Sequence, residues 1–503
     1  MNFFNRAIER AYSVEEKATE KKVNINSVLK ENLDYLKSKF GNSFDLLIRE
    51  TSIGDNDSAF VICDGMCDMM FISESVIKPI LMASRLPEKP EEQLKYISKR
   101  LVTDIELCEV YSLDKVIDKL TNGFVVLFIN GADYAVCLGV QGYKTRGIDE
   151  PSLETQERGS RESFTENFKT NVGMIRRRLK TPQAQFEMMQ IGKSSKTNVY
   201  LCYMTNRVEG AILSQVKRKL SKIDIDTVFE SGYIQHFLDY KGHSFFSGVG
   251  VTERPDTLCA KITEGRIGII VDGTPFALVV PYLFIENFHN IDDYSTRPYY
   301  AFFIRSLKFL SFVLAVFMPG LYVSVVIFHQ EMLPPSIIFD VMSAHAKTPF
   351  PVMVEALVIH FIYEIMREAG LRLPKSIGHA VSIVGGLVIG EAAVSAGIIA
   401  PPMLIIVALT ALASFVIPQL YQPVSVLRLI FIIIGGTMGI FGLMMGAGLL
   451  VINMSAISPY GVSYLSPFTP FELAAMRDTV YRSQWQNLSK RNMKIQNLKG
   501  VKK

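Results

Sequence analysis

Hydrophobic positions follow two different patterns along the chain, and the change comes near residue 300. Before it, short β-type runs alternate with polar and helical stretches. After it, residues 309–328 form twenty consecutive positions without a charge. An apolar helix of that length spans roughly 30 Å, the thickness of bilayer hydrocarbon. The pattern predicts an α/β domain followed by an all-α polytopic membrane domain.

Turn signals recur in the α/β part at a regular spacing. Runs at residues 44–50 and 59–63 flank a Gly-Asp-Asn-Asp turn, which predicts a hairpin. Two later hairpins begin 80 and 81 residues after the first strand of their half, with Asn-Gly at Asn130 and Asp-Gly at Asp272. Both dipeptides favour the positive φ angles of tight hairpin turns. We expect an internal duplication that gives two similar α/β lobes, joined by a polar connector near residues 143–161.

These patterns divide the chain into five parts. We expect a polar helical arm (1–40), a first α/β subdomain (41–145), a linker with a second α/β subdomain (146–300), a membrane domain of four to five apolar segments (301–455) and a basic C-terminal tail (456–503).

The apolar segments leave the number of membrane crossings open. They cover residues 309–328, 351–366, 377–397, 403–417 and 429–452. Arg305 and Lys308 favour a cytoplasmic start, so five crossings would put the tail outside. That tail nevertheless carries eight Lys/Arg after residue 453, which is typical of the cytoplasmic side. Either the tail breaks this rule or one segment does not cross, and the amphipathic 351–366 and the proline-flanked 403–417 are the two candidates.

Composition narrows the class of protein. The chain has 53 basic and 49 acidic residues and a mean hydropathy of +0.22, which indicates a membrane protein and gives no basic surface for nucleic acid. No apolar signal run opens the chain, and all six cysteines precede residue 309. We therefore expect a cytoplasmic, reduced α/β domain. Cys63 and Cys67 lack a second ligand pair nearby, so we expect neither a metal site nor a cofactor.

The usual marks of nucleotide hydrolysis, zinc proteolysis and serine hydrolysis are absent from the sequence. We therefore expect no enzyme and no catalytic residues. The strongest basic cluster lies in the linker and the helix after it, without the interleaved aromatic residues of a nucleic-acid site. We expect it to make contacts between subunits or lobes, through Arg158, Arg161, Arg176, Arg177 and Arg178.

The third apolar segment, residues 377–397, has two distinct faces at about 100° per residue. One face is lined by Val381, Val384, Val388, Glu391 and Ser395. The opposite face has the small residues Ser382, Gly386, Gly390, Ala393 and Gly397, which favour close helix packing. A carboxylate there suits a water-filled pore shared by several copies, with the valines as an apolar constriction. A static pair between Glu391 and His360 or an arginine fits equally well.

Two other segments carry readable patterns. The last apolar segment repeats the small face, which predicts tight packing rather than a hinge, at Gly435, Gly439, Gly442 and Gly446. The second segment has one face of mixed charge, made of His360, Glu364, Arg367 and Glu368. That face fits either an interfacial surface or a buried ion network.

Several motifs in register resemble one known family. They are R-I-G-I-I-V-D-G-T-P-F-A-L from Arg266, P-F-P-x3-E-A from Pro349, E-A-G-L-R-L-P from Glu368, V-S-I-V-G-G-L-V-I-G from Val381 and S-Y-L-S-P from Ser463. The runs R-G-x-R-E-x-F-T-E from Arg158 and T-E-R-P-D from Thr252 fit as well. The chain resembles the GerA family of spore germination proteins, specifically the A subunit of nutrient germinant receptors.

That resemblance implies a cytoplasmic two-lobed domain on a membrane domain and a homo-oligomeric, nutrient-gated cation channel in the spore inner membrane. It also implies assembly with a transporter-like B subunit, which contacts the nutrient, and a lipoprotein C subunit. Glu391 departs from the pattern, since a neutral residue such as glutamine would be expected there. A GerA-like accessory membrane protein of dipicolinic acid release would share these motifs, and a secondary transporter would suit the proline-flanked fourth segment.

Overall fold

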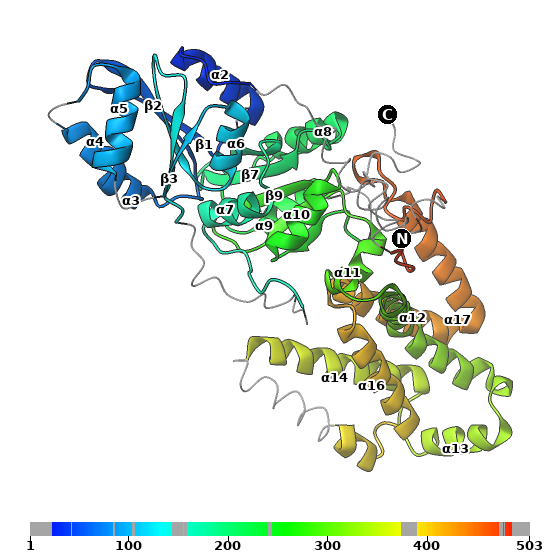
Figure 1. Cartoon of the computed structure of the whole chain (residues 1–503). Helices are drawn as coiled ribbons and strands as arrows, with labels where there is room; N and C mark the ends of the chain where they lie inside the picture. Colours follow the sequence, from blue (N-terminus) through cyan, green and yellow to red (C-terminus); the bar gives the residue numbers. More distant parts are fainter. Residues whose placement is uncertain are drawn as a thin grey trace, which may run out of the picture. The chain divides into compact units, whose positions relative to one another are not determined.

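The computed structural model describes residues 23–41, 43–83, 86–102, 106–142, 154, 158–239, 244–373, 390–471, 476 and 478–484. They belong to two compact units (Figure 1). The α/β unit falls within Met1–Thr155, Ser160–Leu238 and Val249–Val280, and the helical unit within Gln156–Gly159, Asp239–Gly248 and Pro281–Lys503. Arg158 is therefore part of the helical unit, although α/β elements flank it in the sequence.

The first lobe of the α/β unit is built on an antiparallel sheet with strand order β1-β2-β4-β5-β3. Its strands are β1 (Leu46–Ile53), β2 (Asn56–Cys63), β3 (Glu106–Val110), β4 (Val125–Ile129) and β5 (Ala135–Gly139). Its helices are α2 (Leu29–Phe40), α3 (Met69–Ile72), α4 (Lys78–Met82), α5 (Pro90–Tyr96) and α6 (Leu113–Thr121), with π-helical turns at Ser73–Ile77 and Ile97–Leu101. Ile53 pairs with Asn56 across a two-residue turn, which confirms the first predicted hairpin.

The second lobe repeats this topology in the order β6-β7-β9-β10-β8. Its strands are β6 (Ala184–Ile191), β7 (Thr197–Met204), β8 (Gly250–Thr252), β9 (Ile267–Val271) and β10 (Ala277–Val280). Its helices are α7 (Phe168–Arg178), α8 (Gly210–Ser221), α9 (Ser231–Leu238) and α10 (Pro255–Thr263). The matching strand order agrees with the predicted duplication.

The repeat begins with a helix that lies inside the predicted polar arm. In α2, Leu29, Leu33, Leu36 and Phe40 are buried in the core of the first lobe, because their spacing puts them on one helix face. Residues 29–40 therefore do not form a solvated arm, and residues 1–22 lie outside the described part.

The equivalence of α2 and α7 is visible in one side-chain hydrogen-bond pattern. Asn32 binds the backbone of Asn26 through both ends of its amide, at 2.9 and 2.6 Å. Asn171 binds the backbone of Thr165 in the same way, at 2.8 and 2.6 Å. In each lobe, a buried asparagine thus fixes the segment that enters the first helix.

The Asn-Gly and Asp-Gly dipeptides occupy equivalent loops, but these loops are longer than predicted. Gly131 and Gly273 have φ angles of +92° and +89°, as expected. Each connection nevertheless has five residues, 130–134 and 272–276, rather than a tight two-residue turn. The loops reach the segments that precede α2 and α7, since the Gly131 amide donates to Ser27 O and the Gly273 amide to Glu166 O.

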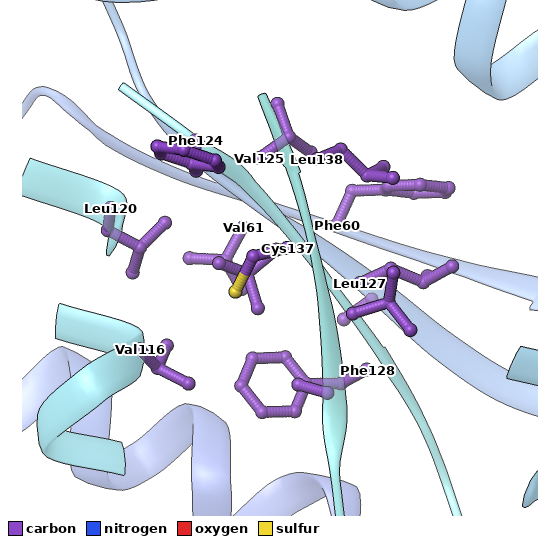
Figure 2. Packing of buried hydrophobic residues seen from close by; sticks show 14 of the residues in the cluster. Phe60, Val61, Val116, Leu120, Phe124, Val125, Leu127, Phe128, Cys137 and Leu138 are labelled. Carbon is purple, nitrogen blue, oxygen red and sulfur yellow. The ribbon is translucent and has the colours of Figure 1, made fainter. Parts of the chain in front are cut away.

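Buried strands form the middle of each sheet. Every residue of β4 is buried, which explains its continuous apolar run. Figure 2 shows Val116 and Leu120 of the amphipathic helix α6 on the same side of the sheet as Val61, with Phe60 and Leu127 on the other side. Neighbouring strand residues point to opposite faces, so each face of this sheet has its own hydrophobic layer.

The helical unit has two long apolar helices and several shorter ones. Its helices are α11 (Asp292–Ser295), α12 (Pro298–Phe328), α13 (Pro335–His345), α14 (Val352–Arg372), α16 (Pro401–Phe415) and α17 (Tyr421–Ala456). Single 3-10 turns lie at Phe284–Phe288, Gln330–Met332, Pro418–Leu420 and Pro459–Gly461. Among the described residues, Pro298–Phe328 and Pro418–Ala456 are long and apolar enough to cross a membrane.

The α17 segment is a helical hairpin rather than one straight helix. Gly439 has φ +65° and ψ −155°, a positive-φ conformation that is essentially restricted to glycine and interrupts the helix. A Cβ built on Gly446 would lie 2.9 Å from the Phe431 ring, although fifteen residues of straight helix would separate them by about 22 Å. The predicted single last segment therefore turns back at Gly439.

The C-terminal tail is held at the start of α12. Arg305 is fully buried and donates to Asp293 and Asp478 at 2.9 Å each and to the Thr479 carbonyl at 2.7 Å. Arg482 donates to the Asp293 carbonyl at 3.1 Å. These bonds place residues 478–482 at the same end of the helical unit as the first turns of α12.

The two lobes of the α/β unit approach backbone to backbone at Gly65 and Gly173. A Cβ built on Gly173 would lie 2.3 Å from the Gly65 carbonyl oxygen. A Cβ on Gly65, whose φ is +79°, would lie 2.7 Å from the Lys169 carbonyl oxygen. Neither position has room for a side chain, because backbone atoms cannot move aside as a side chain can.

We predict that Gly173→Ala destabilises the α/β unit by about 1–3 kcal/mol, the usual cost of overpacking. The matched control is Gly210→Ala, because a Cβ at Gly210 in α8 would meet no atom within 4 Å. The control should be neutral or slightly stabilising. Thermal unfolding of the purified variants measures both, and equal midpoints would contradict the close approach of the lobes.

Candidate functional site

The joint between the lobes is centred on a fully buried ion pair. Arg176 of α7 donates to Asp45 from Nε at 2.7 Å and from Nη2 at 2.9 Å, and to the Thr181 carbonyl from Nη1 at 2.8 Å. Burial opposes the charge of Arg176, but the Asp45 carboxylate outweighs it and raises the pKa of the guanidinium. The Phe186 ring covers the guanidinium at 4.9 Å. This pair joins the segment before β1 to the first helix of the second lobe.

Backbone bonds and stacked rings complete the joint. The Phe44 amide donates to the Phe186 carbonyl at 2.9 Å, and Gln185 Nε2 donates to the Phe40 carbonyl at 2.9 Å. The rings of Phe168 and Tyr200 stack at 4.4 Å, and Phe44 lies 5.5 Å from Tyr200. The lobes are therefore connected by charge, backbone and aromatic contacts at one place.

The other predicted arginines lie in different surroundings. Arg177 and Arg178 both donate to Glu162, and Arg178 also donates to Ser160 Oγ at 3.0 Å. These two arginines thus tie the linker to α7 within the second lobe. Arg161 is exposed, and the Arg158 amide donates to Asp292 Oδ1 at 3.2 Å in the helical unit.

A second buried arginine in this region was not predicted as a site residue. Arg254 donates to Asp256 at 2.7 Å and to the Ser160 carbonyl at 2.8 Å. Arg254 belongs to the T-E-R-P-D motif, and this motif is the feature of the sequence that could have indicated it. The neighbouring Thr252 donates to Glu154 at 2.7 Å, and burial raises the pKa of Glu154 to about 7.

A cleft of about 310 Å³ lies beside the joint of the two lobes. Lys169 and Asp64 form an ion pair there at 3.0 Å. Cys67 also lines the cleft, but its thiol donates to the Gly123 carbonyl, and burial raises its pKa to about 12. No group of three His, Cys, Asp or Glu in the described part of the chain could hold a metal ion.

The helical unit contains its own buried charge network. Arg428 of α17 is buried and donates from Nε to the Ala315 carbonyl at 3.0 Å and from Nη2 to Ser414 Oγ. Its Nη1 lies 3.9 Å from Glu364, which accepts hydrogen bonds from Tyr421 at 2.6 Å and Ser425 at 2.7 Å. The network therefore joins four helices, α12, α14, α16 and α17.

Two histidines, His345 at the end of α13 and His360 within α14, differ in their hydrogen bonding. His345 connects Tyr322, at 2.9 Å, to Glu355, at 2.8 Å, and Glu355 also accepts from the Ala400 amide. His360 is buried, yet neither ring nitrogen has a hydrogen-bond partner in the described structure. Ionisable groups buried between apolar helices are costly, which makes this region a candidate for function.

Comparison with known proteins identifies the family. The sequence profile of the Bacillus/Clostridium GerA spore germination protein family matches residues 34–494. The chain belongs to the GerA family. This agrees with the resemblance seen in its motifs, and the match covers both the α/β unit and the helical unit.

Relatives of this GerA chain extend over most of its length. Spore germination protein KA of Bacillus subtilis is 39% identical over 93% of this chain and 86% of its own. The uncharacterised membrane protein YfkQ of the same species is 36% identical over 93% and 91%. The N-terminal domain of the A subunit of the Bacillus megaterium spore germinant receptor GerK3, a crystal structure, is 30% identical and covers 53% of this chain and 99% of that chain, with a TM-score of 0.43.

The predicted pore segment of the GerA chain is only partly described. Val381, Val384, Val388, Ser382 and Gly386 lie outside the described residues. Residues 390–395 are helical, and both Glu391 and Ser395 are exposed. On the opposite face, Gly390 is buried against Leu404 of α16, and Ala393 is half-buried. The described structure thus contains no hydrogen bond between Glu391 and His360.

The glycines predicted to pack have separate roles. Gly435 lies against α12, since a Cβ there would be 2.3 Å from the Gly320 carbonyl oxygen. Gly439 forms the turn of the α17 hairpin, and Gly442 and Gly446 face the first arm of that hairpin. Gly397 follows the helical turn with φ +67°.

The mixed-charge face predicted on α14 divides between two environments. Glu364 belongs to the network of Arg428, whereas His360 is buried without a hydrogen-bond partner in the described structure. The Arg367 guanidinium lies 3.2 Å from the centre of the Tyr421 ring. Glu368 instead pairs with Arg372 at 2.6 Å, where both side chains are exposed. Of the two predicted alternatives, the buried ion network applies to Glu364, and the exposed surface applies to Glu368.

We predict that Asp45→Asn destabilises the α/β unit by about 3–5 kcal/mol, because it leaves the buried Arg176 charge uncompensated. The control is Asp224→Asn, which breaks a surface pair with Lys193 whose side chains are 74% and 67% exposed. The control should change stability by no more than about 0.5 kcal/mol. Thermal unfolding compares the two variants, and an equal loss of stability in both would contradict the larger contribution expected from the buried pair.

Glu154 predicts a distinct pH dependence. Its folded pKa of about 7 exceeds its ordinary value of 4.5, so the folded state holds a proton that the unfolded state has lost. Its favourable contribution is complete below about pH 4.5 and is lost as pH rises through about 7. Because glutamine has no proton to lose, the free energy of unfolding of Glu154→Gln should rise relative to that of the wild type by about 3 kcal/mol between pH 4 and pH 8. Glu50→Gln, at an exposed position on β1, is the control and should show no such gain.

Proposed function

We propose that the chain is the A subunit of a nutrient germinant receptor and forms a homo-oligomeric cation channel that triggers spore germination. The observation that carries this proposal is the 39% identity to spore germination protein KA over 93% of the chain. The long apolar helix α12 and the two apolar arms of the α17 hairpin support a membrane position for the helical unit.

In this proposal the helical unit is embedded in the spore inner membrane, and the α/β unit and residues 478–484 lie on its cytoplasmic side. The bonds from Arg305 to Asp478 and Thr479 hold the tail at the start of α12, which supports an even number of crossings. The hairpin turn at Gly439 accounts for this number, because it brings the last apolar segment back to its starting side. Arg305 and Lys308 are weak guides to sidedness, since Asp293 lies within 4 Å of both.

The proposed partners follow from the family. A transporter-like B subunit would contact the nutrient, and a lipoprotein C subunit would complete the receptor. The exposed Glu391 and Ser395 support a path shared by several copies, because an exposed carboxylate next to apolar segments needs water or a neighbouring subunit. The buried Gly390 favours packing of the opposite face against α16.

Two other functions compete with this one. One is a GerA-like accessory membrane protein of dipicolinic acid release, and stage V sporulation protein AF of Bacillus subtilis, a sporulation protein by name, is 25% identical over 92% of this chain. The network of Arg428 and Glu364 would suit a secondary transporter. Saturable, substrate-specific flux would favour the transporter, whereas rapid cation conduction in membranes without such saturation favours the channel.

We predict that Val384→Ala causes a cation leak without nutrient. A narrow apolar constriction excludes ions because they would lose their hydration, and smaller side chains lower that barrier. Glu391→Gln should weaken cation preference without closing the path. Ion flux in vesicles that contain the purified protein measures both effects.

The control for this leak is Val407→Ala, the same truncation at a buried position of α16. It should reduce stability by about 1 kcal/mol or more and leave the membrane ion-tight. If Val384→Ala vesicles remain tight while the oligomer is intact, residues 381–391 do not form the gate.

A further inference from the structure

The first turns of α12 present an exposed aromatic face. Tyr299, Phe303, Leu307 and Leu310 are exposed, and the helical period places them within about 80° of one another. Arg305 and Lys308 point the other way and are buried. The exposed side of α12 is therefore apolar from Tyr299 onward, so a bilayer around this helix would have its headgroup region near Tyr299 and Tyr300.

A groove of about 590 Å³ opens at that level, within the usual size range of ligand sites. It is lined by Arg158, Asp292, Ser295, Thr296, Arg297, Tyr299 and Tyr300. All of these residues belong to the helical unit. Tyrosine rings beside a polar groove combine an apolar wall with hydroxyl groups, as membrane-interface sites require.

The charge of the groove favours an anion. The side chains of Arg158 and Arg297 are exposed, and within the described part of the chain neither guanidinium has an ion-pair or hydrogen-bond partner. Asp292 is the one carboxylate among the lining residues, and it accepts the Arg158 backbone amide at 3.2 Å. Two guanidinium groups therefore face one carboxylate, and guanidinium forks bind phosphate oxygens in pairs.

We propose that this groove binds the phosphate of an anionic lipid headgroup, with Arg158 and Arg297 on the phosphate and Tyr299 against the first acyl carbons. The site continues the exposed apolar face of α12, which a free phosphate ion would not use. The inference rests on the proposed membrane position of α12, but it does not depend on channel activity.

The test uses full-length protein in detergent micelles, with native mass spectrometry of bound phosphatidylglycerol, phosphatidylcholine of the same acyl chains, and inorganic phosphate. We expect preferential retention of phosphatidylglycerol. Arg158→Gln and Arg297→Gln should each weaken it about fivefold, which corresponds to about 1 kcal/mol per basic side chain. Tyr299→Ala should weaken retention of both lipids.

The double variant Lys347→Gln/Arg372→Gln is the charge-matched control, because it removes two exposed positive charges of the same unit outside the groove. It should retain phosphatidylglycerol like the wild type. Equal retention by an Arg158→Gln/Arg297→Gln protein with an unchanged melting temperature would overturn the site. Inorganic phosphate that displaces all lipid at equal affinity, with no effect of Tyr299→Ala, would overturn the lipid assignment. Failure of the wild type to enter phosphatidylcholine vesicles would instead refute the membrane position of α12.

Discussion

A fully buried arginine that must be paired organises each unit of this GerA protein. Arg176 and Arg305 are both 0% exposed, and a guanidinium in such a place is tolerated only with carboxylates and carbonyls around it. Asp45 meets that need in the α/β unit, and Asp293 with Asp478 meets it in the helical unit. The Arg176–Asp45 pair joins residues 131 positions apart, and the Arg305–Asp478 pair joins residues 173 positions apart. The two units thus share one solution to holding distant parts of the chain together.

Glycine residues allow the backbones of neighbouring segments to come into direct contact. Gly65 and Gly173 bring the lobes together, and Gly320 and Gly435 bring α12 and α17 together, each pair at a distance that any Cβ would prevent. The same helix α7 carries both Arg176 and Gly173, so close approach and charge pairing occur side by side. Shape and charge therefore fix the joint of the lobes jointly, and a change in either one disturbs the other.

Local signals were readable from the sequence, and long-range partners were not. The β1–β2 hairpin and the regular spacing of the two halves follow from turn residues a few positions apart. The role of α2 was missed, because its many charged residues obscured the pattern of four buried apolar positions on one face. The partners of Arg176 and Arg305 could not be predicted, since sequence spacing carries no information on which distant aspartate completes a buried site. The turn at Gly439 could not be predicted, because apolar residues continue on both sides of it and the same pattern fits one uninterrupted membrane-spanning helix.

In the membrane position proposed above, the turn at Gly439 would also set the thickness of bilayer that the helical unit suits. The 18 residues before it in α17 and the 17 after it reach only about 26 Å each, less than the roughly 30 Å of an average hydrocarbon core. The 31 residues of α12 reach about 46 Å beside them. In a bilayer, the short arms favour local thinning and the long helix favours tilt. Hydrophobic mismatch would then act in opposite directions on neighbouring helices. A change in lipid chain length would therefore alter the tilt of α12 and the bilayer thickness around α17 at the same time.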